Sequence, residues 1–166
     1  MGVDHYWRRT SAEAISGYSP EQLWNLVPSE GSDLFRSDQR QGVVVCAEDT
    51  GDLIKALIRF GATDASQTSA AALFRRLPRD WDEAGLVGTM PPDDVRQVAA
   101  FFAEAPLDRW VEEHRAALDA EIVELGWGGW GAEAWMPQLR RDAQAVAELF
   151  RAAAASGEAV IVKIYA

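Results

Sequence analysis

The 166-residue sequence has little of what usually reveals a compartment or a cofactor. Its single cysteine, Cys46, excludes a disulfide within the chain. Cys46 follows three valines, and we interpret it as a small buried apolar residue. No apolar run approaches the roughly 18 residues that a membrane-spanning helix needs. No charged segment followed by an apolar stretch opens the chain, so we expect a cytoplasmic protein rather than a secreted one.

Basic residues are also scarce. Lys and Arg total 16 against 26 Asp and Glu, which gives a formal net charge of −10, and both halves of the chain are acidic. A surface that binds nucleic acid needs an excess of positive charge. The composition therefore argues against nucleic acid as a partner. It is compatible with a basic protein partner or a cationic ligand, and equally with solubility alone.

Residues that carry chemistry are few. The two histidines, His5 and His114, are far apart in the sequence and no paired cysteines accompany them, so we expect no metal site. His114 shares an apolar helix face with Leu118, which favours a hydrogen-bonded core histidine over a base. Neither a serine nucleophile elbow nor a phosphate-binding lysine loop occurs. A nucleophile–base pair could still form between distant residues, for example Cys46 with either histidine.

The stretch from residue 125 to residue 166 is the most informative part of the chain. Pro137 suits the first turn of a helix, where a missing N–H costs nothing, so we predict a helix that begins near Met136. Gly157 ends it, because glycine readily takes the left-handed conformation. Residues 159–165 are rich in β-branched side chains and predict a strand buried on most of both faces. One helix face is apolar: Leu139, Ala143, Val146, Phe150 and Ala153.

A strand at the end of the chain needs a partner, and the alternating pattern of residues 2–9 supplies one. We predict a single α+β domain over residues 1–166, in which a small mixed sheet contains the N- and C-terminal strands and several helices pack on it, including the long C-terminal helix. A strand over 42–47 joins or borders the sheet. Caps, prolines and glycines predict further helices over 10–17, 20–27, 50–61, 92–105 and 108–125. The remaining segments are predicted as loops at 28–41 and 78–89, a linker at 62–69 and a short helical segment at 70–77.

Several of these features together resemble a known family. The opening Met1-Gly2, Tyr6 and the helix start at Ser11 and Glu13 form one part of the resemblance. The run from Met90 to Val95 resembles a threonine-proline-acid-acid-valine helix start, and residues 122–130 resemble an aromatic turn. With the last helix and strand, these segments are similar to the YfbM-like family, a bacterial domain family of unknown function, mainly over residues 85–166.

The resemblance implies a fold and a bacterial, cytoplasmic setting, and it supplies no catalytic residues. The chain departs from the family pattern at three places. Pro91 stands where the family has a capping threonine, and Gly126-Trp127-Gly128 replaces a tyrosine-proline turn. The predicted helix over 50–61 lacks the tryptophan and histidines of the family pattern, so a site on that helix is absent from this chain if the family has one there.

Residues 126–131 formally match the G-x-G-x-x-G pattern of dinucleotide-binding turns. Such a turn needs a strand before it, a helix that opens within it and an acidic residue after the next strand. Here the preceding residues are predicted to be helical, and the next predicted strand is the last. We therefore expect no cofactor, and we interpret the glycines as a tight turn in which backbone segments approach closely.

The aromatic residues of this turn are the best candidates for a binding surface. Aromatic side chains on a loop can form a contact platform for a partner or a flat ligand, although the same rings can fill the core. We hypothesise a binding or interaction module without catalysis, in which an acidic surface and a Trp-rich loop meet a basic or apolar protein partner. The candidate binding residues are Tyr6, Trp81, Trp127, Trp130, Glu133 and Trp135.

Two alternatives stay open. In the first, the chain is a small-molecule-binding protein or a hydrolase-type enzyme with a cleft near residues 78–89 and 126–135, where Glu133, Asp80 or Asp82 acts as acid or base. In the second, it is a homodimer formed through exposed apolar helix faces. None of these hypotheses includes a cofactor, a metal, a nucleic acid or a membrane.

Overall fold

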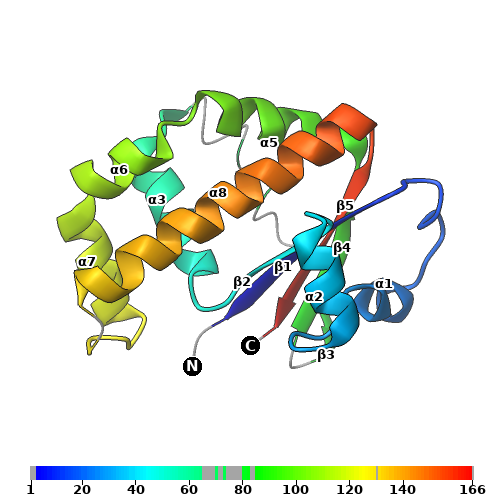
Figure 1. Ribbon diagram of the computed structural model, residues 1–166, viewed down its shortest axis with the longest axis horizontal. Coiled ribbons are helices and arrows are strands. Elements are labelled where there is room, and N and C mark those ends of the chain that lie inside the picture. The colour runs from blue at the N-terminus through cyan, green and yellow to red at the C-terminus, as the bar shows by residue number, and fades with distance from the viewer. Residues whose placement is uncertain are drawn as a thin grey trace.

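A computed structural model of the chain describes residues 3–64, 70, 73, 80–82, 85–129 and 131–165. Its centre is a five-stranded sheet in the order β2-β1-β5-β4-β3 (Figure 1). Every strand pairing within the described residues is antiparallel, so the sheet is not mixed as the sequence predicted. The strands are β1 (Asp4–Thr10), β2 (Val44–Ala47), β3 (Asp80–Asp82), β4 (Gly85–Met90) and β5 (Ala159–Tyr165).

The strands from the two ends of the chain lie side by side, as predicted. Tyr6 stands opposite Lys163 in this antiparallel pair, and the register continues from Asp4 to Thr10. On its other side β5 pairs with β4. Because β5 lies between two strands and packs on both faces, its residues are buried from Ala159 to Lys163. The α+β class and the long C-terminal helix are also as predicted.

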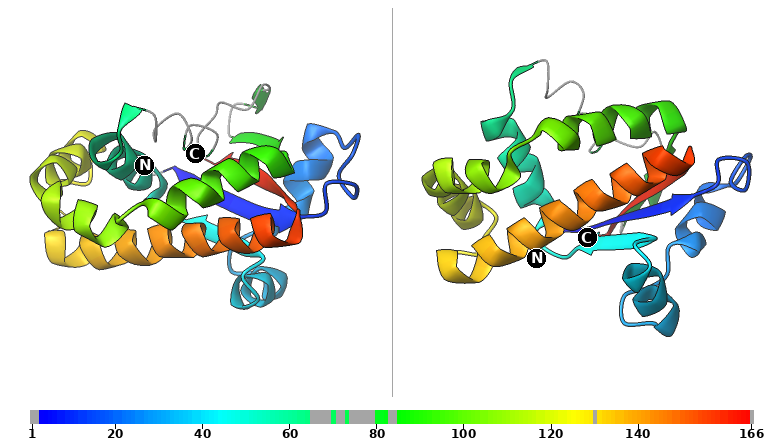
Figure 2. Two further views of the ribbon diagram at one scale, coloured as in Figure 1. Left: turned by 90° about the horizontal axis from the view of Figure 1, so that it is seen from above. Right: turned by 45° about the horizontal axis from the view of Figure 1, so that its top comes forward.

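Helices cover both faces of the sheet. Helix α8 runs diagonally across the molecule (Figure 1), and α5 lies beside it (Figure 2), with Phe102 of α5 against Phe150 of α8 at 6.3 Å between ring centres. Gly157 ends α8 in the left-handed conformation, with φ 67°. None of the described helices is long and apolar enough to span a bilayer. The helices are α1 (Pro20–Leu26), α2 (Asp33–Arg40), α3 (Gly51–Gly61), α5 (Pro92–Glu104), α6 (Leu107–Glu113), α7 (Arg115–Glu124) and α8 (Ala132–Ser156).

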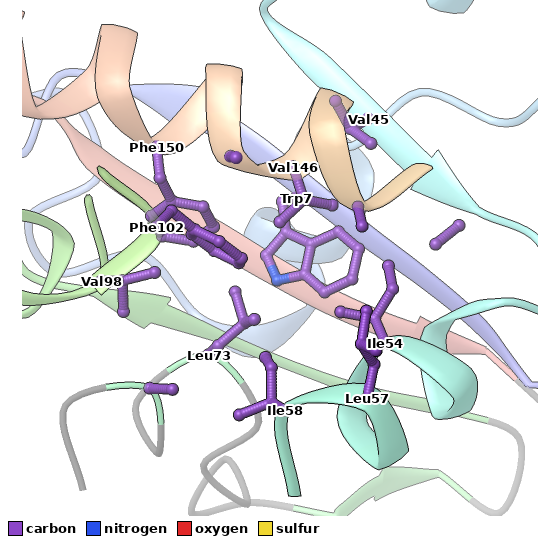
Figure 3. Packing of buried hydrophobic residues seen from close by; sticks show 14 of the residues in the cluster. Trp7, Val45, Ile54, Leu57, Ile58, Leu73, Val98, Phe102, Val146 and Phe150 are labelled. Carbon is purple, nitrogen blue, oxygen red and sulfur yellow. The ribbon is translucent and has the colours of Figure 1, made fainter. Parts of the chain in front are cut away.

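Alternation along the strands sends side chains into two separate hydrophobic cores. Trp7 of β1 is fully buried in the larger core, where α3 and α8 surround it (Figure 3). Its neighbour Tyr6 points to the other face and enters a smaller core with Leu23 of α1 and Phe35 of α2. Each face of the sheet is thus covered by its own set of helices.

Several helix boundaries differ from the predicted ones. Helix α8 begins at Ala132, so Pro137 lies inside it rather than in its first turn. The predicted helix over 108–125 is two helices, since the backbone leaves helical geometry at His114, with φ −106° and ψ 16°. Residues 12–17 form turns instead of a helix. Their expected cap, Thr10, is the last residue of β1, and strand pairing therefore prevails over the local capping signal.

Two segments predicted as loops contain regular structure. Helix α2 lies within residues 28–41, where the Ser32 hydroxyl caps it by accepting a hydrogen bond from the N–H of Phe35. Phe35 packs edge-on against Tyr6, and this contact holds a mostly polar helix on the sheet. β3 and β4 fall within residues 78–89, and β4 forms because it pairs with β5. The predicted linker and short helical segment over 62–77 lie largely outside the described residues.

Candidate functional site

The Trp-rich loop joins α7 to α8. Trp135 is buried in the larger core, where its indole N–H donates to Asp119 Oδ1 at 3.0 Å. It is therefore a core residue and does not reach the surface as a contact. Trp127 is half-buried against the same core, and Glu133 is exposed. Trp130 lies outside the described residues.

The other two predicted binding residues lie elsewhere. Tyr6 is 6% exposed in the smaller core, on the opposite face of the sheet from the core that Trp127 touches. The backbone of Trp81 belongs to β3 at one edge of the sheet, and its side chain is outside the described part of the structure. The structure therefore does not bring Tyr6 together with the Trp-rich loop.

The histidines do not meet Cys46 as a nucleophile–base pair would require. His5 stacks beside Trp7 on the larger-core face of β1, whereas Cys46 stands opposite Tyr6 and faces the smaller core. His114 packs against Phe60 at the junction of α6 and α7. Among the described residues, no three His, Cys, Asp or Glu side chains gather closely enough to hold a metal ion.

A groove of about 290 Å³ follows the outer edge of β2. One wall is the middle of α8, and the other is the end of α2 with the turn that follows it. Because β2 is the last strand on this side of the sheet, the groove gives access to its backbone. Its lining residues are Arg9, Gln39, Gln41, Gly42, Val44, Val45, Cys46, Asp142, Ala145, Glu148, Leu149 and Ala152.

The register of β2 shows which backbone groups face this groove. The N–H of Arg9 donates to the carbonyl of Val43 at 3.0 Å, which makes these two residues a hydrogen-bonded pair. Such pairs alternate in an antiparallel ladder, so the N–H and C=O of Val44 and Cys46 point away from β1. Within the described residues, no backbone hydrogen bond satisfies these outward groups. The edge is therefore open to another extended chain.

Asp142 is the buried charged group in the groove wall. Its Oδ2 accepts a hydrogen bond from the Thr50 hydroxyl, and the Nε2 of Gln138, one helical turn earlier, donates to the carboxylate at 2.9 Å. Burial raises the pKa of the Asp142 carboxyl, and these hydrogen bonds oppose the rise. The two donors fix the carboxylate in one orientation at the groove.

The charge of the groove is negative. Arg9 is the only basic residue among the lining residues, and its Nε forms a salt bridge of 2.9 Å with Glu158. Asp142 and Glu148 have no such salt bridge within the described part of the chain; Glu148 accepts a hydrogen bond from Gln144 at 3.2 Å. A cationic side chain in the groove would therefore meet two carboxylates that form no salt bridge within the described residues, of which Asp142 is influenced by the charge of Arg141.

The sequence did not reveal this groove. The apolar run from Val43 to Cys46 predicts a buried strand, but it does not say that the strand lies at an edge, because that depends on pairing with the distant β1. Asp142 is one acid on a helix that also carries Arg140 and Arg141. Nothing local distinguishes it until the fold brings Thr50 against it.

Comparison of the chain with protein-family models, curated proteins and solved structures finds no match in any of the three.

Proposed function

We propose that the chain is a protein-interaction module without catalysis, which binds an extended basic segment of a partner along the free edge of β2. The observation that supports this is the outward direction of the backbone groups of Val44 and Cys46 inside a groove. A partner segment that lies there adds a strand to the sheet, and main-chain hydrogen bonds then provide affinity.

The charge of the chain indicates which segments fit. The groove presents Asp142 and Glu148, and the whole chain has a net charge of −10. Lysine or arginine side chains that alternate along a bound strand would reach these carboxylates on one face. The opposite charges of the groove and a basic segment accelerate association, and an acidic segment would be repelled. The main-chain hydrogen bonds of the added strand do not depend on the sequence of the segment.

The test is a titration of the isotope-labelled protein with three synthetic peptides, followed by NMR and amide hydrogen exchange. The first alternates lysine and valine over six residues. The second has glutamate in place of lysine, and the third has proline in place of the central valine, which keeps the charge but removes a ladder hydrogen bond. We expect the first peptide to slow exchange at the amides of Val44 and Cys46, and the other two to leave it unchanged.

The neighbouring amides provide an internal control. Val45 and Ala47 belong to the hydrogen-bonded pairs with β1, so their amides are protected with or without a peptide. Slower exchange at Val44 and Cys46 alone supports strand addition. If the proline peptide binds as tightly as the first, or if shifts spread over the acidic surface without a change at these two amides, the proposal is wrong.

The Trp-rich loop is a second contact surface in the same proposal. Val123, at the end of α7, is 66% exposed, and the half-buried Trp127 follows it. Together with the exposed Glu133, these residues supply apolar and acidic groups near the loop for a partner of mixed character. Replacement of Trp127 by alanine should weaken partner binding there while the midpoint of thermal unfolding changes little; a large fall in the midpoint would identify Trp127 as structural.

Three further hypotheses are supported only by patterns in the amino-acid sequence. They are membership of the YfbM-like family, a place in the bacterial cytoplasm and a homodimer. The enzyme alternative depends on Glu133, Asp80 and Asp82, of which the side chains of the two aspartates lie outside the described residues. A thermal-shift screen with metabolites addresses it: a compound that stabilises the wild type but not Glu133→Gln would favour the enzyme.

A further inference from the structure

The smaller core contains a buried amine that the groove does not use. Lys163 lies on β5 in an otherwise apolar run and is 7% exposed. Its Nζ lies 4.1 Å from the ring centre of Trp24 and 5.4 Å from that of Tyr6. The side chain therefore ends between two aromatic rings instead of in solvent.

Lys163, Tyr6 and Cys46 form one row across three neighbouring strands. Tyr6 stands opposite both of the others, on β5 and on β2. Burial raises the pKa of the Tyr6 hydroxyl and of the Cys46 thiol, so both groups are neutral at physiological pH. The row thus provides polar neighbours for the amine but no negative charge.

No carboxylate compensates the charge of Lys163 within the described part of the chain. The acids Asp4 and Glu30 affect the titration of Tyr6 and Cys46, and neither forms a salt bridge with Lys163. A buried ammonium without a carboxylate is unfavourable, and burial accordingly lowers the pKa of Lys163. The lowered pKa leaves a larger fraction of the amine neutral than in an exposed lysine, against the preference of the two rings for the charged form, and the neutral amine is the nucleophilic form.

The amine is close to the surface despite its burial. The Trp24 ring that covers it is half-buried on α1, and it contacts Tyr165, whose side chain is 47% exposed. Trp24 thus lies against both Nζ and the partly exposed Tyr165, and an entering ligand would have to displace its ring. The flat faces of Trp24 and Tyr6 favour a planar group stacked beside them.

We infer that Lys163 is a covalent attachment site for a planar aldehyde, which it holds as an imine between the rings of Trp24 and Tyr6. The nitrogen lone pair forms a bond to the carbonyl carbon. Both hydrogens of the neutral amine then leave with the carbonyl oxygen as one molecule of water, and the carbon–nitrogen double bond remains. Nothing is oxidised or reduced, and the inference is independent of the peptide groove.

The composition of the chain makes the test direct. The sequence has two lysines, and the second, Lys55, is exposed on α3 and serves as an internal control. The full-length protein is treated at neutral pH with 2-hydroxybenzaldehyde and cyanoborohydride, which reduces the imine and fixes the adduct. Mass spectrometry of the digest then reports modification at Lys163, Lys55 and the N-terminus separately. We expect Lys163 to react about tenfold faster than Lys55.

Two further measurements separate a built site from accidental reactivity. Cyclohexanecarbaldehyde, which is not planar, should lose the preference for Lys163, so that the ratio of its rates at Lys163 and Lys55 falls below the ratio for the planar aldehyde. Trp24→Ala should remove the preference for the planar aldehyde even where circular dichroism shows an intact fold. Modification of Lys55 as fast as Lys163 in the folded wild type would overturn the inference, and so would an undiminished planar preference in Trp24→Ala.

Discussion

The hydroxyl of Thr50 donates a hydrogen bond to Oδ2 of Asp142, a residue 92 positions further along the chain. Thr50 immediately precedes α3 and does not cap that helix with its side chain. Its hydroxyl instead joins the start of α3 to the middle of α8. The same carboxylate lines the groove along β2, so one residue contributes both to helix packing and to the proposed binding surface.

Replacement of Asp142 by asparagine tests the cost of burying its charge. Burial raises the folded-state pKa of this carboxyl above its ordinary value of 3.8. The contribution of Asp142 to stability is therefore full below the unfolded pKa and is lost as the pH rises through the folded pKa. Asparagine remains neutral and still accepts the Thr50 hydrogen bond. We expect Asp142→Asn to lie within about 1 kcal/mol of the wild type at low pH and to gain relative stability as the pH rises.

Urea unfolding at a series of pH values measures this effect. Asp142→Ala is the matched comparison, since it leaves the buried Thr50 hydroxyl without its acceptor. It should cost about 1–3 kcal/mol at low pH, and this cost should shrink as the pH rises because the wild type loses the contribution of Asp142. An asparagine variant that instead loses stability relative to the wild type as the pH rises would mean that the charged carboxylate is favoured in the fold.

Trp127 in the loop before α8 and Trp135 in the first turns of α8 should differ sharply in their effect on stability. Trp135 is fully buried and its indole N–H is bonded to Asp119, so Trp135→Ala should cost about 3–5 kcal/mol. Trp135→Phe keeps most of the ring and loses the hydrogen bond, for a cost of about 0.5–1.5 kcal/mol. Trp127 is half-buried, and its replacement by alanine should cost less than that of Trp135. Chemical unfolding of the three variants checks the order, and equal losses for the two alanine variants would contradict it.

The contact between Gly51 and His5 leaves no room for a larger residue. A Cβ built on Gly51 would lie 2.0 Å from His5 Nδ1 and 2.9 Å from its Cβ, and His5 is buried. Gly51→Ala should therefore destabilise the protein by about 1–3 kcal/mol, although alanine favours helices. Gly129→Ala is the control: apart from its chain neighbours, no described residue has an atom within 4 Å of the Cβ built there, and the expected change is within about 0.5 kcal/mol. A neutral Gly51→Ala would mean that His5 moves aside.

The sequence predicted the elements that depend on interactions between neighbouring residues, and it missed most of those that depend on residues far away in the chain. The Ser19 cap with Gln22 and the Gly157 stop are complete within one helical turn, and both were confirmed. Helix α2 and strand β4 were missed, because each depends on a distant partner: Phe35 on Tyr6, and β4 on β5. The pairing of the two terminal strands is long-range as well, but a buried strand at the chain end requires a partner, and the alternating N-terminal segment was the candidate.

The candidate sites show the same division. The edge position of β2 and the contact of Thr50 with Asp142 have no local signal, so the groove could not be predicted. Lys163 did have one, since it is a charged residue inside the apolar run of β5. Trp135 shows the converse error, because an aromatic residue beside a glycine-rich loop has the same local pattern whether it faces the partner or the core.

The acidic groove should recognise charge at a defined position and not only through the net charge of the chain. Glu148 lines the groove and is exposed, so Glu148→Gln should weaken binding of the lysine–valine peptide about two- to fivefold, as expected for an exposed ion pair. The loss should diminish at high salt because exposed charges are screened. NMR titration of each variant at two salt concentrations measures the loss of peptide affinity and its dependence on salt.

Glu124→Gln supplies the control for this measurement. It makes the same change in net charge on α7, a helix that does not line the groove, and Glu124 is exposed. If the peptide binds in the groove and contacts Glu148, Glu148→Gln weakens binding and Glu124→Gln does not. Equal weakening by both variants would mean that the peptide responds only to the overall field of an acidic protein. The extended-strand contact at Val44 and Cys46 would then lack the side-chain recognition that a specific partner requires.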